Sequence, residues 1–188
     1  QVGRVDVYEN TGSGAAFYSS CSGTLIAPRL VLTAAHCVLD ELQMMFTGTG
    51  FFPVQGVTYA TNLFTFQITI SGAFEYYAVT AYQVVGAYNS LWQVLSAAED
   101  VAVLMLATEV PQTSAVPAKI STQILSQGTP VSEFGFGETC AGCGDNGKQR
   151  GLSNLPYLQS NVGCQGDSGG PLFWQGEIQG IISIVYCG

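Results

Sequence analysis

One serine of this chain lies in a segment that suits neither a helix nor a strand. Residues 166–172 read Gly-Asp-Ser-Gly-Gly-Pro-Leu, with the hydroxyl of Ser168 at the centre. Glycine adopts backbone angles that other residues resist and lets a substrate approach the main chain, while proline has no amide hydrogen. We therefore expect a tight loop that displays the Ser168 hydroxyl, followed by a strand from Leu172. An ordinary glycine-rich turn has the same composition, so other residues must decide between the two.

A serine hydroxyl is a weak nucleophile and needs a base within hydrogen-bonding distance. His36 is the only histidine of the chain, so a serine–histidine mechanism has to use it. A neutral imidazole is suited to accept a proton near neutral pH, although a lone histidine is often an ordinary core or surface residue. The pattern G-x-S-x-G also fits the nucleophile elbow of the α/β hydrolases. We reject that fold because it requires a histidine after the serine, and none follows Ser168.

An imidazole base needs a carboxylate that orients it, and three aspartates are candidates. Asp100 directly precedes the apolar run Val-Ala-Val-Leu-Met-Leu-Ala, and a carboxylate at the start of a buried strand needs hydrogen-bond partners. Asp100 could equally cap that strand. Asp40 is close to His36 in sequence but lies in a polar segment. Asp6 would give the chain order Asp, His, Ser, which an unrelated class of proteases uses. The residues by themselves leave this choice open.

Composition and charge limit the partners of the chain. Hydrophobic residues make up 47% and charged residues 10%, which is enough for a substantial core. The formal net charge is −8, with five Lys plus Arg, and this argues against nucleic acid and anionic membranes because both need basic patches. No apolar run of about 18 residues lacks turn formers, so we expect no membrane span. The oligomeric state is left open.

The even number of cysteines predicts disulfides and an oxidising, extracellular compartment. The six cysteines are Cys21, Cys37, Cys140, Cys143, Cys164 and Cys187. A zinc site is not expected with a single histidine and one C-x-x-C pair, and we expect no other metal and no cofactor. A redox role for the C-x-x-C pair is disfavoured, because it lies among glycines without the helix N-terminus that lowers a thiol pKa.

The elements that position these side chains read as short strands. Residues 46–88 are rich in Val, Ile, Thr, Tyr and Phe and are broken by glycines, which indicates an all-β barrel or sandwich. Two short strands are expected on either side of Pro28-Arg29. The apolar run at 101–107 predicts a fully buried strand, and residues 178–185 predict a further strand.

A linker divides these strands into two groups. Residues 109–117 contain two prolines and several polar side chains. We therefore expect one β unit at residues 1–108, which carries His36 and Asp100, and a second at residues 109–188, which carries Ser168.

Three motifs occur in a fixed order along the chain. They are Leu-Thr-Ala-Ala-His-Cys at 32–37, Asp-Val-Ala-Val-Leu at 100–104 and Gly-Asp-Ser-Gly-Gly-Pro at 166–171. Together they resemble the chymotrypsin/trypsin-like serine endopeptidases, and the resemblance extends from about Val5 to Cys187. It implies two antiparallel β-barrels with the active site in the cleft between them. It also implies a secreted hydrolase that cleaves proteins or peptides through an acyl-enzyme.

The resemblance implies a role for each candidate residue. His36 would be the general base, Asp100 its orienting partner and Ser168 the nucleophile. The backbone N–H groups of Gly166 and Ser168 would form the oxyanion hole. A catalytically weak or inactive binding protein on the same fold is the alternative.

The resemblance further implies the disulfides Cys21–Cys37 and Cys164–Cys187, which leaves Cys140–Cys143 as the third. It assigns the primary substrate pocket to two uncharged segments, whose residues are Val162, Gly163, Ser183, Ile184 and Val185. Because no carboxylate is present to pair with Arg or Lys, and β-branched Val185 should narrow the mouth, we expect cleavage after small or medium apolar residues.

Some features depart from the pattern of this family. The separation of His36 from Asp100 indicates an insertion in the region 46–91. The start, Gln-Val-Gly-Arg, does not match the Ile-Val-Gly-Gly whose freed amine pairs with the aspartate before the serine, here Asp167. The chain ends at Gly188, before the strand and helix that normally close the second barrel, so we expect that barrel to be truncated.

Overall fold

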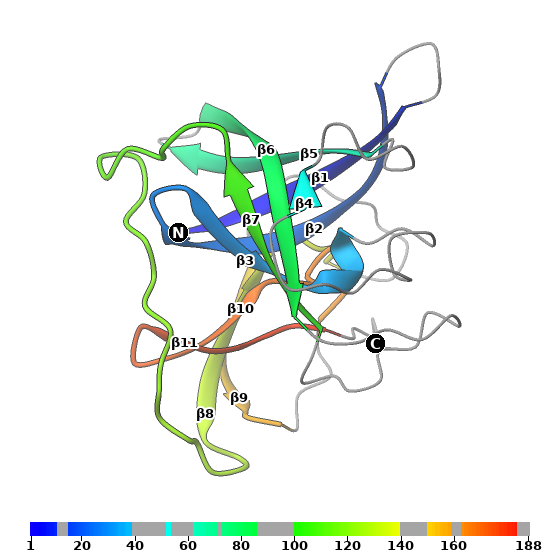
Figure 1. The fold of residues 1–188 in the computed structure, drawn as a ribbon. Helices are drawn as coiled ribbons and strands as arrows, with labels where there is room; N and C mark the ends of the chain where they lie inside the picture. Colours follow the sequence, from blue (N-terminus) through cyan, green and yellow to red (C-terminus); the bar gives the residue numbers. More distant parts are fainter. Residues whose placement is uncertain are drawn as a thin grey trace.

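The computed structural model describes residues 1–10, 15–38, 52–53, 62–70, 73–85, 100–139, 150–158 and 163–183, and nearly all regular structure in them is β (Figure 1). The strands are β1 Val2–Asn10, β2 Ala15–Ala27, β3 Leu30–Thr33, β4 Phe52–Pro53, β5 Asn62–Ile70, β6 Ala73–Val85, β7 Val101–Leu106, β8 Pro130–Gly135, β9 Arg150–Pro156, β10 Pro171–Trp174 and β11 Glu177–Ile181. A short 3-10 helix, η1 Ala35–Cys37, follows β3. In these ranges no helix is long and apolar enough to cross a membrane.

The first sheet curls into a barrel. Its strand order is β4-β6-β5-β1-β2-β3-β7, and a further pairing of β6 with β7 joins its two sides. Every pairing is antiparallel, as short glycine-separated strands predict. Alternate side chains point inward and form the main core, in which Leu25, Phe66 and Leu104 are fully buried. The expected turn at Pro28-Arg29 joins β2 to β3.

Strand β7 corrects one expectation. Residues 101–107 were predicted to be buried on both faces, but only Ala102, Leu104 and Leu106 are buried, and the residues between them are partly exposed. The reason is that β7 is a barrel strand, paired on one side with β3 and on the other with β6, so one face meets the barrel core. Val101 and Val103, on the other face, pack against a small second cluster around Ile178.

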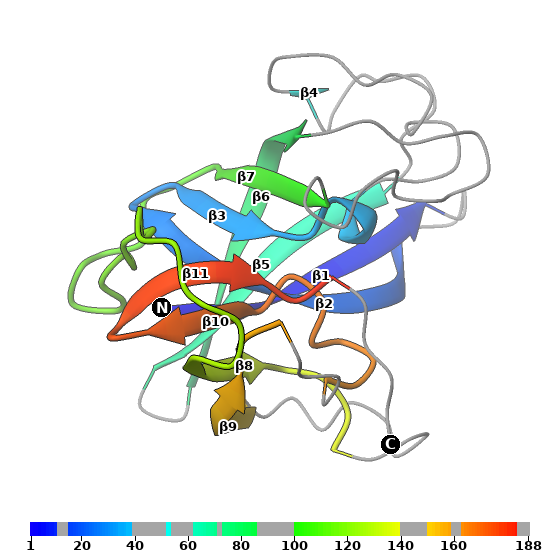
Figure 2. The same cartoon turned by 90° about the horizontal axis from the view of Figure 1, so that it is seen from below.

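The second sheet has the order β11-β10-β8-β9 and is also antiparallel. Figure 2 shows these strands gathered on one side of the molecule, with β3, β6 and β7 on the other. The connection 107–129, which contains the predicted linker, joins the two sheets. The all-β architecture in two antiparallel sheets agrees with the two-barrel fold that the resemblance implies, and the boundary at residue 108 stays a prediction.

Strand β11 is shorter than expected, because it ends at Ile181 and the following residues 182–183 are not in a strand, while residues 184–185 lie outside the described residues. The backbone of Ile182 bonds the loop that carries Ser168 instead of a neighbouring strand. Its carbonyl accepts the Gly169 N–H at 2.7 Å, and its N–H donates to the Gly170 carbonyl at 2.8 Å. The end of β11 therefore supports the serine loop directly.

Candidate active site

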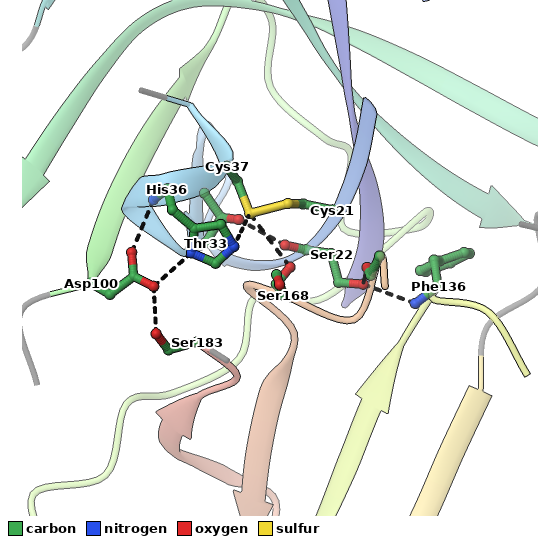
Figure 3. The surroundings of a disulfide bond; sticks show 10 residues. Cys21, Ser22, Thr33, His36, Cys37, Asp100, Phe136, Ser168 and Ser183 are labelled. Carbon is green, nitrogen blue, oxygen red and sulfur yellow. Dashed lines mark hydrogen bonds and ion pairs between the residues drawn. A yellow bond between two sulfur atoms is a disulfide. The ribbon is translucent and has the colours of Figure 1, made fainter. Parts of the chain in front are cut away.

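The pairing of β3 with β7 brings His36 and Asp100 together. Thr33 lies opposite Ala102 in this antiparallel pair, so the residues that follow β3 meet those that precede β7. Asp100 is fully buried, and its Oδ1 accepts the backbone N–H of His36 at 2.9 Å. Its Oδ2 lies 2.7 Å from His36 Nδ1 (Figure 3). A proton on Nδ1 that is donated to this carboxylate leaves Nε2 as the acceptor.

Ser183 contributes a further contact that the sequence did not reveal. Its hydroxyl donates to Asp100 Oδ2 at 2.6 Å, whereas the sequence placed Ser183 in the substrate pocket. The contact has a physical reason, because a buried carboxylate is stable only when its oxygens accept hydrogen bonds. No local signal marks Ser183 for this role, since the two residues are 83 positions apart.

Ser168 lies in a tight loop that is held by both sheets. The loop turns at Gly166 and Gly169, whose φ angles are +95° and +81°. The carbonyl of Ser168 accepts the N–H of Ser22 in β2 at 2.7 Å, and Gly169 is bonded to Ile182 beyond β11. Ser168 is 7% exposed. The peptide between Ser168 and Gly169 is therefore anchored on both sides, to β2 through its carbonyl and to Ile182 through its N–H.

The Cys21–Cys37 disulfide lies between the imidazole and the serine loop (Figure 3). Cys37 Sγ is 3.8 Å from His36 Nε2 and 3.7 Å from the Ser168 carbonyl oxygen. Among the hydrogen bonds of the described residues, none joins the Ser168 hydroxyl to His36 Nε2. The hydrogen bond between a catalytic serine and its histidine is often long or poorly aligned in structures without substrate. The structure thus places His36 Nε2 and the Ser168 backbone carbonyl beside one sulfur and orients the imidazole through Asp100.

The side chain of Asp167 anchors the loop that carries Ser168 through two hydrogen bonds. Its carboxylate is fully buried and accepts the N–H of Gly137 at Oδ1 and the N–H of Cys164 at Oδ2, both at 2.8 Å. A side chain at Gly135 or Gly137 would overlap this carboxylate, which explains the Gly-Phe-Gly segment.

The first residues of the chain form β1 and pair with β2, and the Gln1 carbonyl accepts the N–H of Leu25.

The N–H groups of the serine loop differ in their partners. Those of Asp167, Gly169 and Gly170 donate to carbonyl oxygens of Cys164, Ile182 and Asp167 respectively. Those of Gly166 and Ser168 make no hydrogen bond with any residue that the structure describes. Two such donors, separated by one residue, suit an anionic oxygen.

Two glycines with the same backbone conformation provide a matched pair for a stability test. Gly169 and Gly176 have φ angles of +81° and +82°. A Cβ at Gly169 would overlap Thr33 Oγ1 and the Ser22 carbonyl oxygen, whereas a Cβ at Gly176 meets nothing within 4 Å. We expect Gly176→Ala to lower the free energy of unfolding by about 1 kcal/mol, for the φ angle alone.

For Gly169→Ala we expect a loss of about 3 kcal/mol or more, because overpacking adds to the same backbone strain. Denaturant unfolding of both variants measures the difference. Equal losses would show that the serine loop is not packed against β2 and β3 as described.

The structure describes some of the other predicted site residues and not the rest. The Cys21–Cys37 disulfide is confirmed, and Cys164 is disulfide-bonded to a partner outside the described residues. Also outside them are Cys140, Cys143, Val162, Ile184, Val185, Cys187 and the alternative aspartate Asp40.

Two other residues singled out from the sequence, and one group of side chains that could in principle bind a metal, lie within the described residues. Gly163 is buried next to Cys164. Asp6 is fully buried, and an oxygen of its carboxylate lies 2.7 Å from Arg4 Nε in the same strand. His36 and the sulfurs of Cys21 and Cys37 lie within 4.8 Å of one another, but the sulfurs are bonded to each other and are not thiolate ligands for a metal.

Comparisons with known proteins agree with this fold. The family model described as Trypsin matches residues 3–161 and 155–188. The chain is 30% identical over 209 residues to chymotrypsin-like elastase family member 1 of Bos taurus, covering 92% of this chain and 71% of that protein. It is 26% identical over 223 residues to Trypsin CFT-1 of Choristoneura fumiferana, covering 96% and 78%.

Among solved structures, the fold is similar to that of neuropsin, a serine protease expressed in the limbic system of mouse brain. The TM-score is 0.65 at 20% identity, and the match covers 98% of this chain and 83% of that one.

Proposed function

Because this chain belongs to the trypsin family of serine endopeptidases, we propose that it hydrolyses peptide bonds with Ser168 as nucleophile, His36 as general base and Asp100 as orienting carboxylate. One observation carries the proposal. The buried Asp100 carboxylate bonds both the backbone N–H and Nδ1 of His36, which fixes the imidazole with Nε2 directed away from the carboxylate. This is the arrangement that a base acting on a neighbouring hydroxyl requires.

The proposed reaction proceeds through an acyl-enzyme. His36 Nε2 takes the proton of the Ser168 hydroxyl as Oγ attacks the carbonyl carbon, and the Asp100 carboxylate stabilises the imidazolium that forms. The imidazolium then protonates the leaving amine as the C–N bond breaks. A water molecule, deprotonated by His36, hydrolyses the ester and regenerates Ser168.

The N–H groups of Gly166 and Ser168 are the proposed oxyanion hole. Both lack a hydrogen-bond partner within the described residues, while the loop around them is bonded on both sides. Donors fixed before the reaction stabilise the developing charge without reorganisation, and each is worth on the order of 10²- to 10³-fold in rate.

Covalent labelling tests the proposed function. A fluorophosphonate probe reacts with serines that are activated as nucleophiles, so we expect one adduct, located on Ser168 by peptide mass mapping. Ser168→Ala is expected to take up no probe. The absence of an adduct on the folded wild-type chain would contradict the proposal and would support the inactive binding protein instead.

We also propose that the protein acts outside the cell on protein or peptide substrates. The Cys21–Cys37 disulfide supports this location, because structural disulfides form and persist in oxidising compartments.

The proposed specificity is cleavage after small or medium apolar residues such as Ala, Val or Leu. It rests on the family resemblance, which would place the uncharged residues Val162 and Gly163 at the pocket base and Val185 at its wall. A peptide library scored by the residue before the cut measures this preference. A strong preference for Arg or Lys would contradict it, and a preference for Phe or Tyr would show that Val185 does not narrow the pocket. Val185→Gly is expected to widen the accepted range toward aromatic residues.

A further inference from the structure

Ser22 is a buried polar residue of β2 that connects three distant parts of the chain. Its hydroxyl donates to the Gly166 carbonyl at 2.8 Å and accepts the N–H of Phe136, just beyond β8, at 2.8 Å (Figure 3). Its own N–H donates to the Ser168 carbonyl at 2.7 Å. A serine hydroxyl has one proton to donate and lone pairs to accept, so both side-chain bonds form at once. Ser22 therefore holds the serine loop with its backbone and its side chain.

The hydrogen bond from the Ser22 hydroxyl reaches the peptide that lies between the two proposed oxyanion-hole donors. The N–H of Gly166 belongs to the peptide before Gly166, and the N–H of Ser168 belongs to the peptide before Ser168. The Gly166 carbonyl belongs to the peptide between those two. Glycine at φ +95° gives little torsional resistance to rotation of the adjoining peptides, so the orientation of this peptide depends on its hydrogen bonds. Its N–H, that of Asp167, donates to the Cys164 carbonyl at 2.9 Å, and its carbonyl is the group that Ser22 holds.

Other bonds hold the neighbouring peptides but not this carbonyl. The Gln165 carbonyl accepts the N–H of Glu138 at 2.9 Å, and the Asp167 carbonyl accepts the N–H of Gly170 at 2.9 Å. The hydrogen bond to the Gly166 carbonyl comes from the Ser22 side chain. Phe136, bonded to the same hydroxyl, adjoins Gly137, which binds Asp167. One hydroxyl thus connects β2, the end of β8 and the central peptide of the loop.

We propose that the Ser22 side chain is a positioning residue for the oxyanion hole. It fixes the peptide between the two that supply the N–H donors and so keeps both donors aligned in the transition state. The inference rests on the proposed function and adds a residue to it that neither touches the substrate nor moves a proton. Its effect should appear in kcat and in the binding of oxyanion mimics, and not in ground-state binding.

Thr24 offers a matched control. It lies two residues further along β2 on the same face, is fully buried like Ser22, and its hydroxyl makes no hydrogen bond within the described part of the chain. Thr24→Val removes a buried hydroxyl from the same strand without touching the serine loop. Ser22→Ala and Ser22→Gly remove the Ser22 hydroxyl and keep the backbone bond to Ser168. Ser22→Thr restores a hydroxyl at that position.

The experiment measures kcat and KM for a peptide substrate, together with the affinity of a peptide boronate, whose adduct with Ser168 places an oxygen in the oxyanion hole. We expect Ser22→Ala to lower kcat by on the order of ten-fold, less than the loss of a direct donor, with KM within about two-fold. The boronate affinity should fall by a similar factor. Ser22→Thr should recover most of kcat, and Thr24→Val should match the wild type.

The outcomes separate this inference from the proposed function. A wild-type chain that neither cleaves peptides nor binds the boronate would overturn both. An active wild type with equal kcat for Ser22→Ala and Thr24→Val would overturn only the role of Ser22. If both Ser22→Ala and Ser22→Gly fail to fold while Thr24→Val folds, the hydroxyl serves the whole fold, and the positioning role is also overturned.

Discussion

Ser168→Ala is expected to lower kcat for peptide hydrolysis by on the order of 10⁶-fold, which is the size of loss that removal of the serine causes in an enzyme with this triad. The acyl-enzyme cannot form without Oγ, and the residual rate then depends on the oxyanion hole and substrate binding. The fold should be unaffected, because the Ser168 hydroxyl makes no hydrogen bond within the part of the chain that the structure describes. His36→Ala is expected to have an effect of similar size, since no other histidine exists to replace it.

Steady-state kinetics with a peptide substrate and thermal unfolding of the same samples check this prediction together. Ser132→Ala, in β8, is a suitable control because its hydroxyl contacts only the exposed Ser153 among the described residues. A Ser168→Ala protein that keeps more than about one hundredth of the wild-type rate would contradict the nucleophile assignment.

Asp100→Asn is expected to lower kcat by on the order of 10⁴-fold while the protein remains folded. The Asp100 carboxylate accepts the His36 backbone N–H at Oδ1 and both His36 Nδ1 and the Ser183 hydroxyl at Oδ2. An asparagine has one acceptor oxygen, so its amide NH₂ must face one of these groups. If the NH₂ faces Nδ1, the imidazole proton moves to Nε2, and the base loses the lone pair that accepts the Ser168 proton.

Asp6→Asn is the control for this second prediction. Asp6 is also fully buried and also an aspartate, but its carboxylate is paired with Arg4 in β1. Its replacement should lower stability, because it leaves the Arg4 charge without its partner, and should lower kcat far less than Asp100→Asn. Equal losses of kcat in Asp6→Asn or Asp40→Asn would show that Asp100 was the wrong choice of orienting carboxylate.

The types of the proposed catalytic groups could be read from the sequence because they depend on local chemistry. A serine among glycines, one histidine at the end of a strand and an aspartate before an apolar run are each visible within a few residues. The same holds for the turn at Pro28-Arg29 and for the loop at Gly166 and Gly169, whose positive φ angles only glycine adopts without strain. The order of three motifs was sufficient for the family and hence for the all-β fold.

Which residues meet was decided by the tertiary structure. That Asp100 rather than Asp6 contacts His36 follows from the register of β3 against β7, which brings together residues 64 positions apart. The bond from Ser22 to Gly166 spans 144 positions and has no local signature. The one-sided burial of β7 and the early end of β11 have the same origin. Propensity and hydrophobic pattern report on neighbours along the chain, whereas the contacts of an antiparallel barrel are set by strand pairing across long separations.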